Sequence, residues 1–365
     1  MNIAIHISDS NLLKDGLFDI NNARDNILER YVVLQRHLKV LGHNCHTLDF
    51  YDYKNIDVFI FYRLDLQIKD ILTVIKYNPY VKLFYIAPEP PLICHIHSPH
   101  ILEKFNVDRI FTWNDDAIIL NVRKIIKINF GTPVINPNSI SNMPFTRRAQ
   151  ICAIFSNKTS NGDNELYSER LSSIKYIHDR NNSIDLYGYG WDSSTDDIIK
   201  RCYKGVVANK TDVLSRYRYS LCYENSNRYN GYISEKMFDS FSAGCIPIFY
   251  GAPNVTELIP KNTFINYQDF KNLTELEIFL ESIDEKKYSE YLSYINDFVN
   301  SVSFRKYSSN GFVDSVNNII DKVDKSKISR KNILKIKCEF IKKMIQYPNI
   351  FINDKRFLYN YFRFW

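Results

Sequence analysis

The chain has 365 residues, 45% of them hydrophobic and 24% charged, which is an ordinary globular composition and a length that suits two domains. It contains no run of about 18 apolar residues, and its N-terminus lacks the basic and apolar regions of a secretion signal, so we expect neither a membrane span nor export. Seven cysteines occur singly, without a CxxC pair, and indicate reduced thiols in a cytoplasmic protein.

The first part of the chain alternates short apolar strands with helical segments. Residues 24–41 carry apolar side chains at helical period. The predicted strands are NIAIHI (2–7), CHTLD (45–49), DVFIFY (57–62), KLFYIA (82–87) and RIFTW (109–113). Strands separated by helices indicate βαβ units and a mainly parallel sheet, so we expect a first Rossmann-like domain over residues 1–145.

A segment rich in Pro, Asn and Ser at 130–145 is the predicted linker to a second series of elements. Helices are expected near 165–178 and 234–243. The predicted strands are ICAIFS (151–156), IDLYGYG (184–190), YSLCYEN (219–225) and CIPIFYG (245–251). We therefore predict an α/β fold of two Rossmann-like domains facing a cleft, the second one over residues 146–324.

The positive charge is concentrated at the C-terminal end. Residues 325–365 carry a net charge of +9 and the remainder −3, which argues against a basic nucleic-acid groove. Residues 328–345 predict a basic amphipathic helix, and eight aromatic residues follow between 347 and 365. This pattern favours a tail that binds an anionic membrane surface at the inner face of the cytoplasmic membrane. Packing of the same helix on the body of the protein is the alternative.

Polar residues gather where the second series passes from strand to helix. Asn225 follows a predicted strand, and Tyr232, Glu235 and Lys236 lie at the start of the next helix, for which Ser234 is the predicted N-cap. The unpaired amides and partial positive charge of a helix N-terminus suit a diphosphate. Lys236 adds a full positive charge, and Glu235 offers an acceptor for ribose hydroxyls.

In this same segment the chain resembles a known family. The stretches SLCYENS, GYISEK, AGCIPIFYGAPN and IPKNTFINYQDF resemble, in order and spacing, the C-terminal domain of the family 10 glycosyltransferases, the α-1,3/1,4-fucosyltransferases, in a bacterial form. The resemblance is close over 150–270 and looser over 80–115. Ser234 stands where the family usually has Thr, which preserves the hydroxyl.

The resemblance implies roles for individual residues. Arg170 corresponds to the arginine that helps neutralise the donor diphosphate, and Glu89 to the catalytic carboxylate, although Pro90 replaces the family's Ser. It further implies a fold of GT-B type, GDP-fucose as donor, a glycan acceptor and inversion at the anomeric carbon. We expect no metal cofactor, because Lys236 and Arg170 supply the cationic charge. Lipopolysaccharide or another surface glycan is the expected product, with GlcNAc or Glc accepting the fucose.

Other interpretations stay open at this point. Glu235 and Lys236 alone would describe a solvated helix start, Asn225 a turn, Arg170 a surface arginine and Glu89 an exposed loop carboxylate. The fold is also compatible with a different nucleotide sugar, or with a protein that binds glycans or membranes without catalysis.

Two further motifs resemble metal ligands. Asp115 and Asp116 follow a strand, and we expect these acids to cap the following helix rather than to bind a metal. The segment from Cys94 to His100 holds three histidines and a cysteine but lacks a clear second half for a zinc site. An acceptor-side loop, with one histidine touching sugar hydroxyls, is the favoured interpretation.

Overall fold

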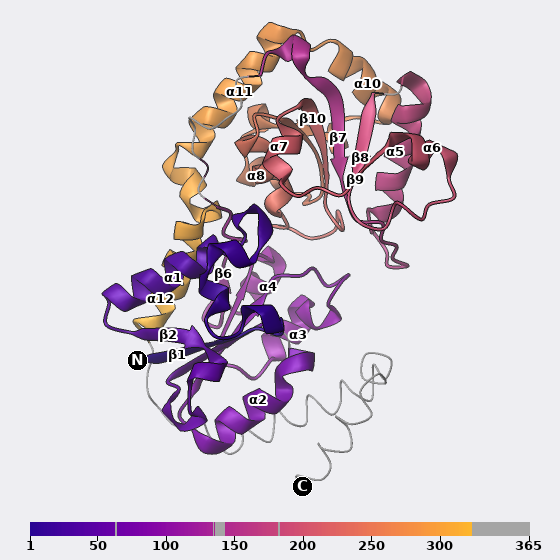
Figure 1. Ribbon diagram of the computed structural model, residues 1–365. Coiled ribbons are helices and arrows are strands. Elements are labelled where there is room, and N and C mark those ends of the chain that lie inside the picture. The colour runs from indigo at the N-terminus through magenta and orange to yellow at the C-terminus, as the bar shows by residue number, and fades with distance from the viewer. Residues whose placement is uncertain (63, 134, 136–142, 182, 323–365) are drawn as a thin grey trace.

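The computed structural model describes every residue except 63, 134, 136–142, 182 and 323–365. The described chain forms two α/β domains, each built on a six-stranded sheet (Figure 1). The predicted basic tail at 325–365 lies outside the described residues.

The first sheet has the strand order β2-β1-β3-β4-β5-β6, and all its pairs are parallel. Its strands are β1 (Asn2–His6), β2 (Asn44–Thr47), β3 (Val58–Phe61), β4 (Lys82–Ala87), β5 (Arg109–Thr112) and β6 (Ile125–Lys127). Its helices are α1 (Glu29–Val40), α2 (Leu64–Tyr77), α3 (Pro99–Lys104) and α4 (Asp115–Leu120). All five predicted strands are present; β6 was missed because three residues are too few to show a periodic pattern.

The second sheet has the order β12-β11-β10-β7-β8-β9, again entirely parallel. Its strands are β7 (Ala149–Ile154), β8 (Ile184–Tyr187), β9 (Tyr203–Gly205), β10 (Tyr217–Tyr223), β11 (Ile246–Tyr250) and β12 (Ile265–Asn266). Its helices are α5 (Tyr167–Asn181), α6 (Asp197–Cys202), α7 (Lys210–Leu214), α8 (Glu235–Ser242), α9 (Val255–Leu258) and α10 (Leu273–Glu281). This is the doubly wound order, and its topological switch point lies between β7 and β10.

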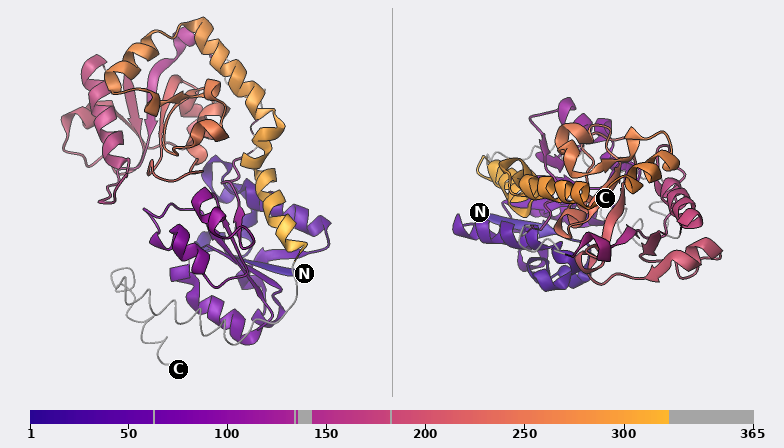
Figure 2. Two further views of the ribbon diagram at one scale, coloured as in Figure 1. Left: turned by 180° about the vertical axis from the view of Figure 1, so that it is seen from behind. Right: turned by 90° about the horizontal axis from the view of Figure 1, so that it is seen from above.

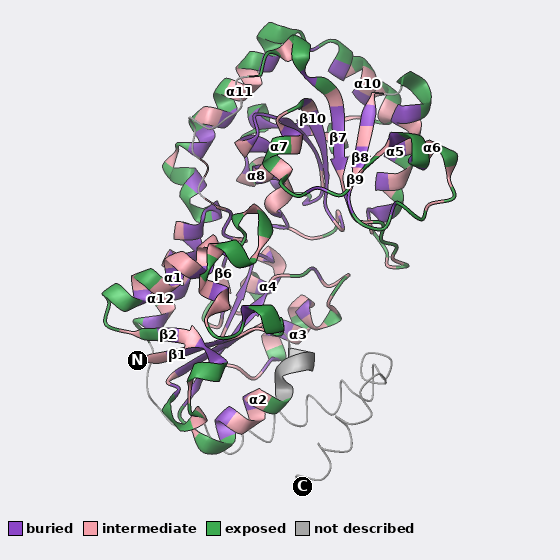
Figure 3. Ribbon diagram, viewed as in Figure 1, coloured by how far each residue is buried: buried purple, intermediate pink, exposed green. Residues whose placement is uncertain are grey.

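The central strands are buried almost throughout, as Figure 3 shows. A parallel sheet covered on both faces needs apolar residues at successive positions; β3 (VFIF) and, after Lys82, β4 (KLFYIA) meet that need, and every residue of both strands is buried. Six of the seven cysteines are described; no disulfide joins any two of these six, and five of them are buried, as predicted. They act as small apolar side chains of the core.

The last two described helices connect the domains. Helix α11 (Glu285–Val299) packs on the second domain, and α12 (Ser309–Ile320) lies beside α1 on the first (Figures 1 and 2). Phe312, Val316 and Ile320 of α12 join the core of the first sheet. The predicted second domain, 146–324, therefore ends in a helix that packs on the first domain.

No described helix is both long and apolar enough to cross a membrane.

Candidate functional site

A cavity of about 240 Å³ lies at the switch point of the second sheet. Its walls include the ends of β7 and β10, the first turn of α8, and the segment that joins β1 to α1 in the first domain. Because strands β7 and β10 are neighbours in the sheet, their carboxyl ends open a crevice that binds ligands in many α/β proteins. Four of the five predicted donor-site residues line this cavity: Arg170, Asn225, Glu235 and Lys236.

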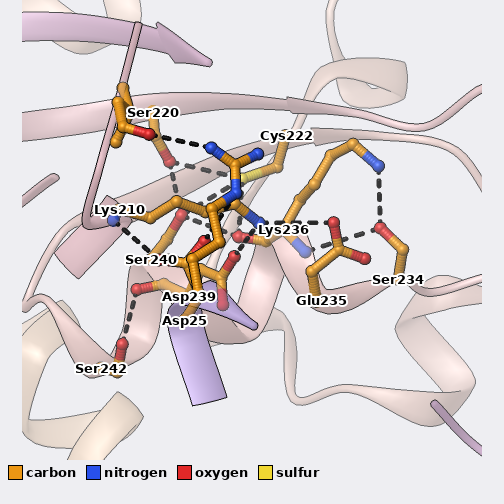
Figure 4. Close-up of polar contacts among 12 residues, drawn as sticks. Asp25, Lys210, Ser220, Cys222, Ser234, Glu235, Lys236, Asp239, Ser240 and Ser242 are labelled. Carbon is orange, nitrogen blue, oxygen red and sulfur yellow. Dashed lines mark hydrogen bonds and ion pairs between the residues drawn. The ribbon is translucent and has the colours of Figure 1, made fainter. Parts of the chain in front are cut away.

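The N-terminus of α8 is organised by one buried acid. Ser234 is the N-cap, as predicted, and its hydroxyl accepts a hydrogen bond from the Lys236 amide. The Glu224 carboxylate accepts from the Ser234 amide at 2.7 Å and pairs with Lys236 Nζ at 3.0 Å. Lys236 Nζ also donates to Ser234 Oγ at 2.9 Å. Figure 4 shows Lys236 and Ser234 side by side in this arrangement.

Glu224 is the main residue that the sequence interpretation missed. Its side chain is fully buried. Burial works to lower the pKa of Lys236, but the carboxylates of Glu224 and Glu235 more than offset it and raise that pKa above its ordinary value. The available signal was the acid directly after a buried strand, in the run SLCYENS. A charge at that position has to be paired, and Lys236 is its partner.

Arg170 comes from the first turn of α5 and is 5% exposed. Its Nη2 donates to the carbonyl of Tyr223 at 2.8 Å and to Asn225 Oδ1 at 3.0 Å, and the guanidinium lies 4.5 Å from the centre of the Phe155 ring. Burial lowers its pKa. Nε is buried and makes no hydrogen bond to any described residue. Arg170 thus brings a cation with unused donor capacity to the cavity wall.

Tyr232 takes a different position from the other four predicted residues. It is 3% exposed, does not line the cavity, and is reached through Asn225, whose Nδ2 donates to Tyr232 Oη at 3.1 Å. Its ring packs on Trp113 of the first domain, with centroids 4.6 Å apart. The structure therefore places Tyr232 at the domain contact, behind Asn225.

A further cation of the cavity, Lys210, was not predicted. Lys210, at the start of α7, pairs with Asp239 at 2.7 Å and lies 3.5 Å from Glu235 (Figure 4). Burial opposes its charge, and the carboxylates of Glu235 and Asp239 nevertheless raise its pKa. Burial works to raise the pKa of Glu235, while Lys236 and Lys210 lower it to about 2. Glu235 is therefore ionised at neutral pH and held between two ammonium groups.

Glu89 lies on the exposed loop that follows β4. Three consecutive backbone carbonyls of this loop each accept a hydrogen bond from a side chain: Ala87 from Thr112 at 3.1 Å, Pro88 from Trp113 Nε1 at 2.6 Å, and Glu89 from His97 Nδ1 at 2.7 Å. The loop thus has a fixed backbone, and Glu89 projects from it. Burial is the main cause that raises the pKa of Tyr167 and of Tyr232, and the negative charge of Glu89 adds to both.

His97 has a structural role that the sequence did not predict. It is 2% exposed, and its Nε2 lies 2.8 Å from Tyr85 Oη, so this ring is enclosed beneath the loop rather than open to a sugar. The favoured interpretation of Cys94–His100, a histidine touching sugar hydroxyls, is not met by His97. Among the residues that the structure describes, no three His, Cys, Asp or Glu side chains form a group suited to a metal.

The two acids after β5 also differ from expectation. Asn114, not Asp115 or Asp116, caps α4 through the Ala117 amide. Asp115 pairs with Lys127 at 2.5 Å and accepts from Asn254 of the second domain at 3.3 Å. The prediction that these acids cap the helix is therefore wrong; Asp115 bridges the domains instead.

Comparisons with known proteins agree with this geometry. The model of glycosyltransferase family 10 (fucosyltransferase), C-terminal part, matches residues 145–337, which include the whole second sheet and all the cavity residues except Arg24. That match covers more than half of the chain. The chain belongs to glycosyltransferase family 10.

Curated members of family 10 resemble the chain over part of their length. An α-(1,3)-fucosyltransferase of Helicobacter pylori is 42% identical over 82 residues, which are 22% of this chain and 16% of that protein. The mouse 4-galactosyl-N-acetylglucosaminide 3-α-L-fucosyltransferase 9 is 25% identical over 224 residues, 60% of this chain and 53% of its own. The chain thus spans about half the length of the mammalian relative and less of the bacterial one.

Solved structures show the same fold. An α-1,3-fucosyltransferase crystallised with GDP-fucose superposes with a TM-score of 0.53 at 16% identity, covering 88% of this chain and 90% of the other. A DNA-modifying β-glucosyltransferase gives a TM-score of 0.55 at 15% identity, covering 88% and 100%. The predicted α/β fold of two Rossmann-like domains is confirmed. Because the second enzyme matches as well as the first, the superposition identifies the fold and not the donor.

A glycine of the stretch GYISEK lies in close contact with the first domain. Gly231 has φ +82°, and a Cβ there would lie 2.5 Å from the Trp113 carbonyl oxygen and 2.7 Å from the Asp115 carboxylate. Only glycine accommodates both the left-handed backbone and this approach. The first domain therefore abuts the loop that leads into α8, directly before the residues of the cavity.

Proposed function

We propose that this family-10 chain is an inverting fucosyltransferase, which moves L-fucose from GDP-fucose to a hydroxyl of a glycan. The observation that carries the proposal is the cavity at the switch point, where Arg170, Asn225, Glu235 and Lys236 meet inside the region matched by the family. The relatives, which are α-1,3-fucosyltransferases by name, support an α-1,3 linkage. GlcNAc or Glc is the proposed acceptor residue.

The donor half of the proposed reaction rests on charge. When the bond between C1 of fucose and the β-phosphate oxygen breaks, negative charge develops on the departing GDP. Lys236 and Arg170 are both cavity residues, and Arg170 has unused hydrogen-bonding capacity at Nε. We place the diphosphate against these two cations and the first amides of α8. Glu235, ionised and partly exposed, is the proposed acceptor for ribose hydroxyls.

The acceptor half rests on Glu89. The acceptor oxygen attacks C1 of β-L-fucose from the face opposite the leaving phosphate and forms an α bond, while its proton passes to the Glu89 carboxylate. One C–O bond forms, one C–O bond breaks, and GDP leaves with the electron pair. A well-placed general base contributes about 10²–10⁴-fold. The three anchored carbonyls give the Glu89 loop the rigidity that this role requires.

We further propose that the transfer needs no metal ion. The charge that a divalent cation would supply at the leaving group is the charge that Lys236 and Arg170 carry. Transfer in the presence of excess EDTA should equal transfer with added Mg²⁺ or Mn²⁺. Abolition by EDTA and restoration by one metal would contradict this part of the proposal and leave the donor assignment intact.

The proposed cellular setting is the cytoplasmic face of the inner membrane, where the enzyme fucosylates lipopolysaccharide or another lipid-linked glycan. The support is the sequence of residues 325–365, with a net charge of +9 and eight aromatic residues. Sedimentation with vesicles containing anionic lipid should fall when the chain is truncated after Asp324. Equal sedimentation of the truncated chain would contradict the membrane role of the tail.

One alternative donor deserves a direct test. A β-glucosyltransferase whose structure was solved with uridine diphosphoglucose shares the fold, so a different nucleotide sugar is the second candidate. The protein is incubated with N-acetyllactosamine and, in turn, GDP-fucose, GDP-mannose, UDP-glucose and UDP-galactose, and release of nucleoside diphosphate is measured. We expect turnover with GDP-fucose alone. Turnover with only another nucleotide sugar would mean that GDP-fucose is not the donor. Binding of N-acetyllactosamine without turnover of any nucleotide sugar would favour a non-catalytic glycan-binding protein.

A further inference from the structure

The segment between β1 and α1 belongs to the first domain but lines the cavity of the second. Arg24 is one of the cavity residues, and its Nη1 donates to the Val207 carbonyl of the second domain at 2.8 Å. Its guanidinium lies 5.4 Å from the centre of the Tyr189 ring, another cavity residue. Arg24 therefore reaches across the domain boundary into the proposed donor site.

Asp25, the next residue in the chain, holds Arg24 in this position. Asp25 accepts a hydrogen bond from the Lys210 amide at 3.0 Å, and its side chain is only 8% exposed. Figure 4 shows Asp25 beside Lys210 and Asp239. Asp25 and Asn26 have φ of 57° and 53°, a left-handed conformation that costs energy in residues other than glycine. The backbone beside Arg24 is thus held in a costly shape by a contact with the other domain.

The charges of the cavity show what Arg24 is suited to bind. Five cationic and two acidic side chains line it. Lys236 is paired with buried Glu224, and Lys210 with Asp239. Arg24 has one acid nearby, Asp25 at 3.5 Å, its side chain is 46% exposed, and its Nη2 makes no hydrogen bond to a described residue. It therefore offers an available donor edge to an anion in the cavity.

We propose that Arg24 is a donor-binding residue contributed by the first domain, which contacts the diphosphate of the nucleotide sugar. Affinity for the donor then depends on the contact between the domains, because Asp25 and the Val207 carbonyl hold Arg24 in place. This inference rests on the proposed function only in taking a nucleoside diphosphate sugar as the ligand. It does not depend on Glu89, on fucose or on the acceptor.

The test is the binding of GDP, UDP and ADP to the full chain, measured by calorimetry without any acceptor. Arg24→Gln should weaken binding of the preferred diphosphate roughly tenfold, as expected for loss of a charge-assisted contact, and should make the remaining affinity less sensitive to salt. Arg24→Lys should fall between Arg24→Gln and the parent. Arg36→Gln, at an exposed position of α1 outside the cavity, is the matched control and should bind like the parent.

The outcomes separate this inference from the proposed donor. If the parent binds GDP and Arg24→Gln binds it equally well, the role of Arg24 is overturned and GDP stands. If the parent prefers UDP and Arg24→Gln weakens UDP binding, Arg24 is supported and GDP is overturned. If Arg24→Gln binds weakly and thermal unfolding shows that it is also destabilised, a second variant, Asp25→Asn, distinguishes the two causes. That variant keeps an acceptor for the Lys210 amide, and it should retain binding if Arg24 itself makes the contact; loss of binding there as well would overturn the direct role.

Discussion

The carboxyl edges of the two sheets differ in the interactions that hold their functional groups in place. At the second sheet the important groups are charges, and the two lysines are each paired with an acid: Lys236 with Glu224, and Lys210 with Asp239. At the first sheet the important feature is a backbone, and hydrogen bonds from the side chains of Thr112, Trp113 and His97 hold it. The donor side is prepared electrostatically, whereas the Glu89 side is prepared by geometry.

This difference suits the proposed division of labour. A diphosphate brings two or more negative charges and is stabilised by cations that stay charged despite burial, together with backbone amides. A general base needs a defined position relative to one hydroxyl, and a shift of about 1 Å costs a large part of the rate. Four substitutions test the comparison, from the largest expected effect to the smallest.

Glu89→Gln should reduce the rate of transfer by about 10²–10⁴-fold, because the amide cannot accept the proton. The affinity for GDP should stay unchanged, since Glu89 is not among the cavity residues. Initial rates and calorimetry on the same preparation measure both. Glu103→Gln, on α3 of the same domain, is the control and should behave as the parent. If Glu89→Gln transfers fucose at the parent rate, Glu89 is not the general base, and the comparison between the two sheets fails on the side of the first.

Lys236→Met should abolish measurable GDP binding and also lower the free energy of unfolding by about 3 kcal/mol, because buried Glu224 loses its partner. The double variant Glu224→Gln/Lys236→Met should regain most of the stability and none of the binding. Urea unfolding and calorimetry separate the two effects. Lys287→Met, which breaks the exposed pair with Glu290, should change neither quantity appreciably. Recovery of GDP binding in the double variant would show that Lys236 serves only the fold.

The residues of the donor side were easier to predict from the sequence than the contacts between the domains. Asn225, Glu235 and Lys236 were found because the donor side is assembled from one continuous stretch in which strand, cap and helix follow each other. Their spacing along the chain already fixes their closeness in space. The fold was predictable for a similar reason, because fully buried parallel strands are apolar runs that any single sequence displays.

Apart from Glu224, what escaped prediction depends on contacts between residues far apart in the sequence. Arg24 meets Val207 across 183 residues, and Asp115 meets Asn254 across 139. Nothing in the local sequence of Arg24 distinguishes it from any charged residue before a helix. Helix α12 is a similar case, since its apolar face is visible in the sequence but its return to the first domain is not. Tertiary packing, not local propensity, decides these positions.

His97→Ala should lower kcat roughly tenfold while leaving the KM for the donor unchanged, because the Glu89 carbonyl loses its donor and the loop gains freedom. A carbonyl oxygen can only accept, so Nδ1 of His97 carries a hydrogen, and the amide nitrogen of Asn occupies a similar position. His97→Asn should therefore restore much of the rate. His100→Ala, an exposed neighbour, serves as the control. Equal losses in kcat and in donor affinity would indicate a general structural role and weaken the geometric side of the comparison.

The smallest expected effect concerns Asp239, on the electrostatic side. Burial, aided by the charge of Glu235 and opposed by Lys210, raises its pKa to about 6. An acid whose pKa is raised by folding stabilises the folded state fully below its unfolded pKa, and this contribution disappears as the pH rises through the folded pKa. Between about pH 4 and 6 the parent should therefore lose up to about 2 kcal/mol of stability that Asp239→Asn does not lose.

Urea unfolding of the parent and of Asp239→Asn at pH 4.5 and pH 6.5 measures this difference. The free energy of unfolding of Asp239→Asn should rise relative to that of the parent as the pH rises. Asp212→Asn, at an exposed position of α7, should have the same pH dependence as the parent. If Asp239→Asn is instead less stable relative to the parent at the higher pH, the pair with Lys210 outweighs burial and lowers the folded pKa of Asp239. The charges around Lys210 would then stabilise one another more than burial disfavours them, and the contrast with the hydrogen-bonded backbone of the Glu89 loop would be sharper still.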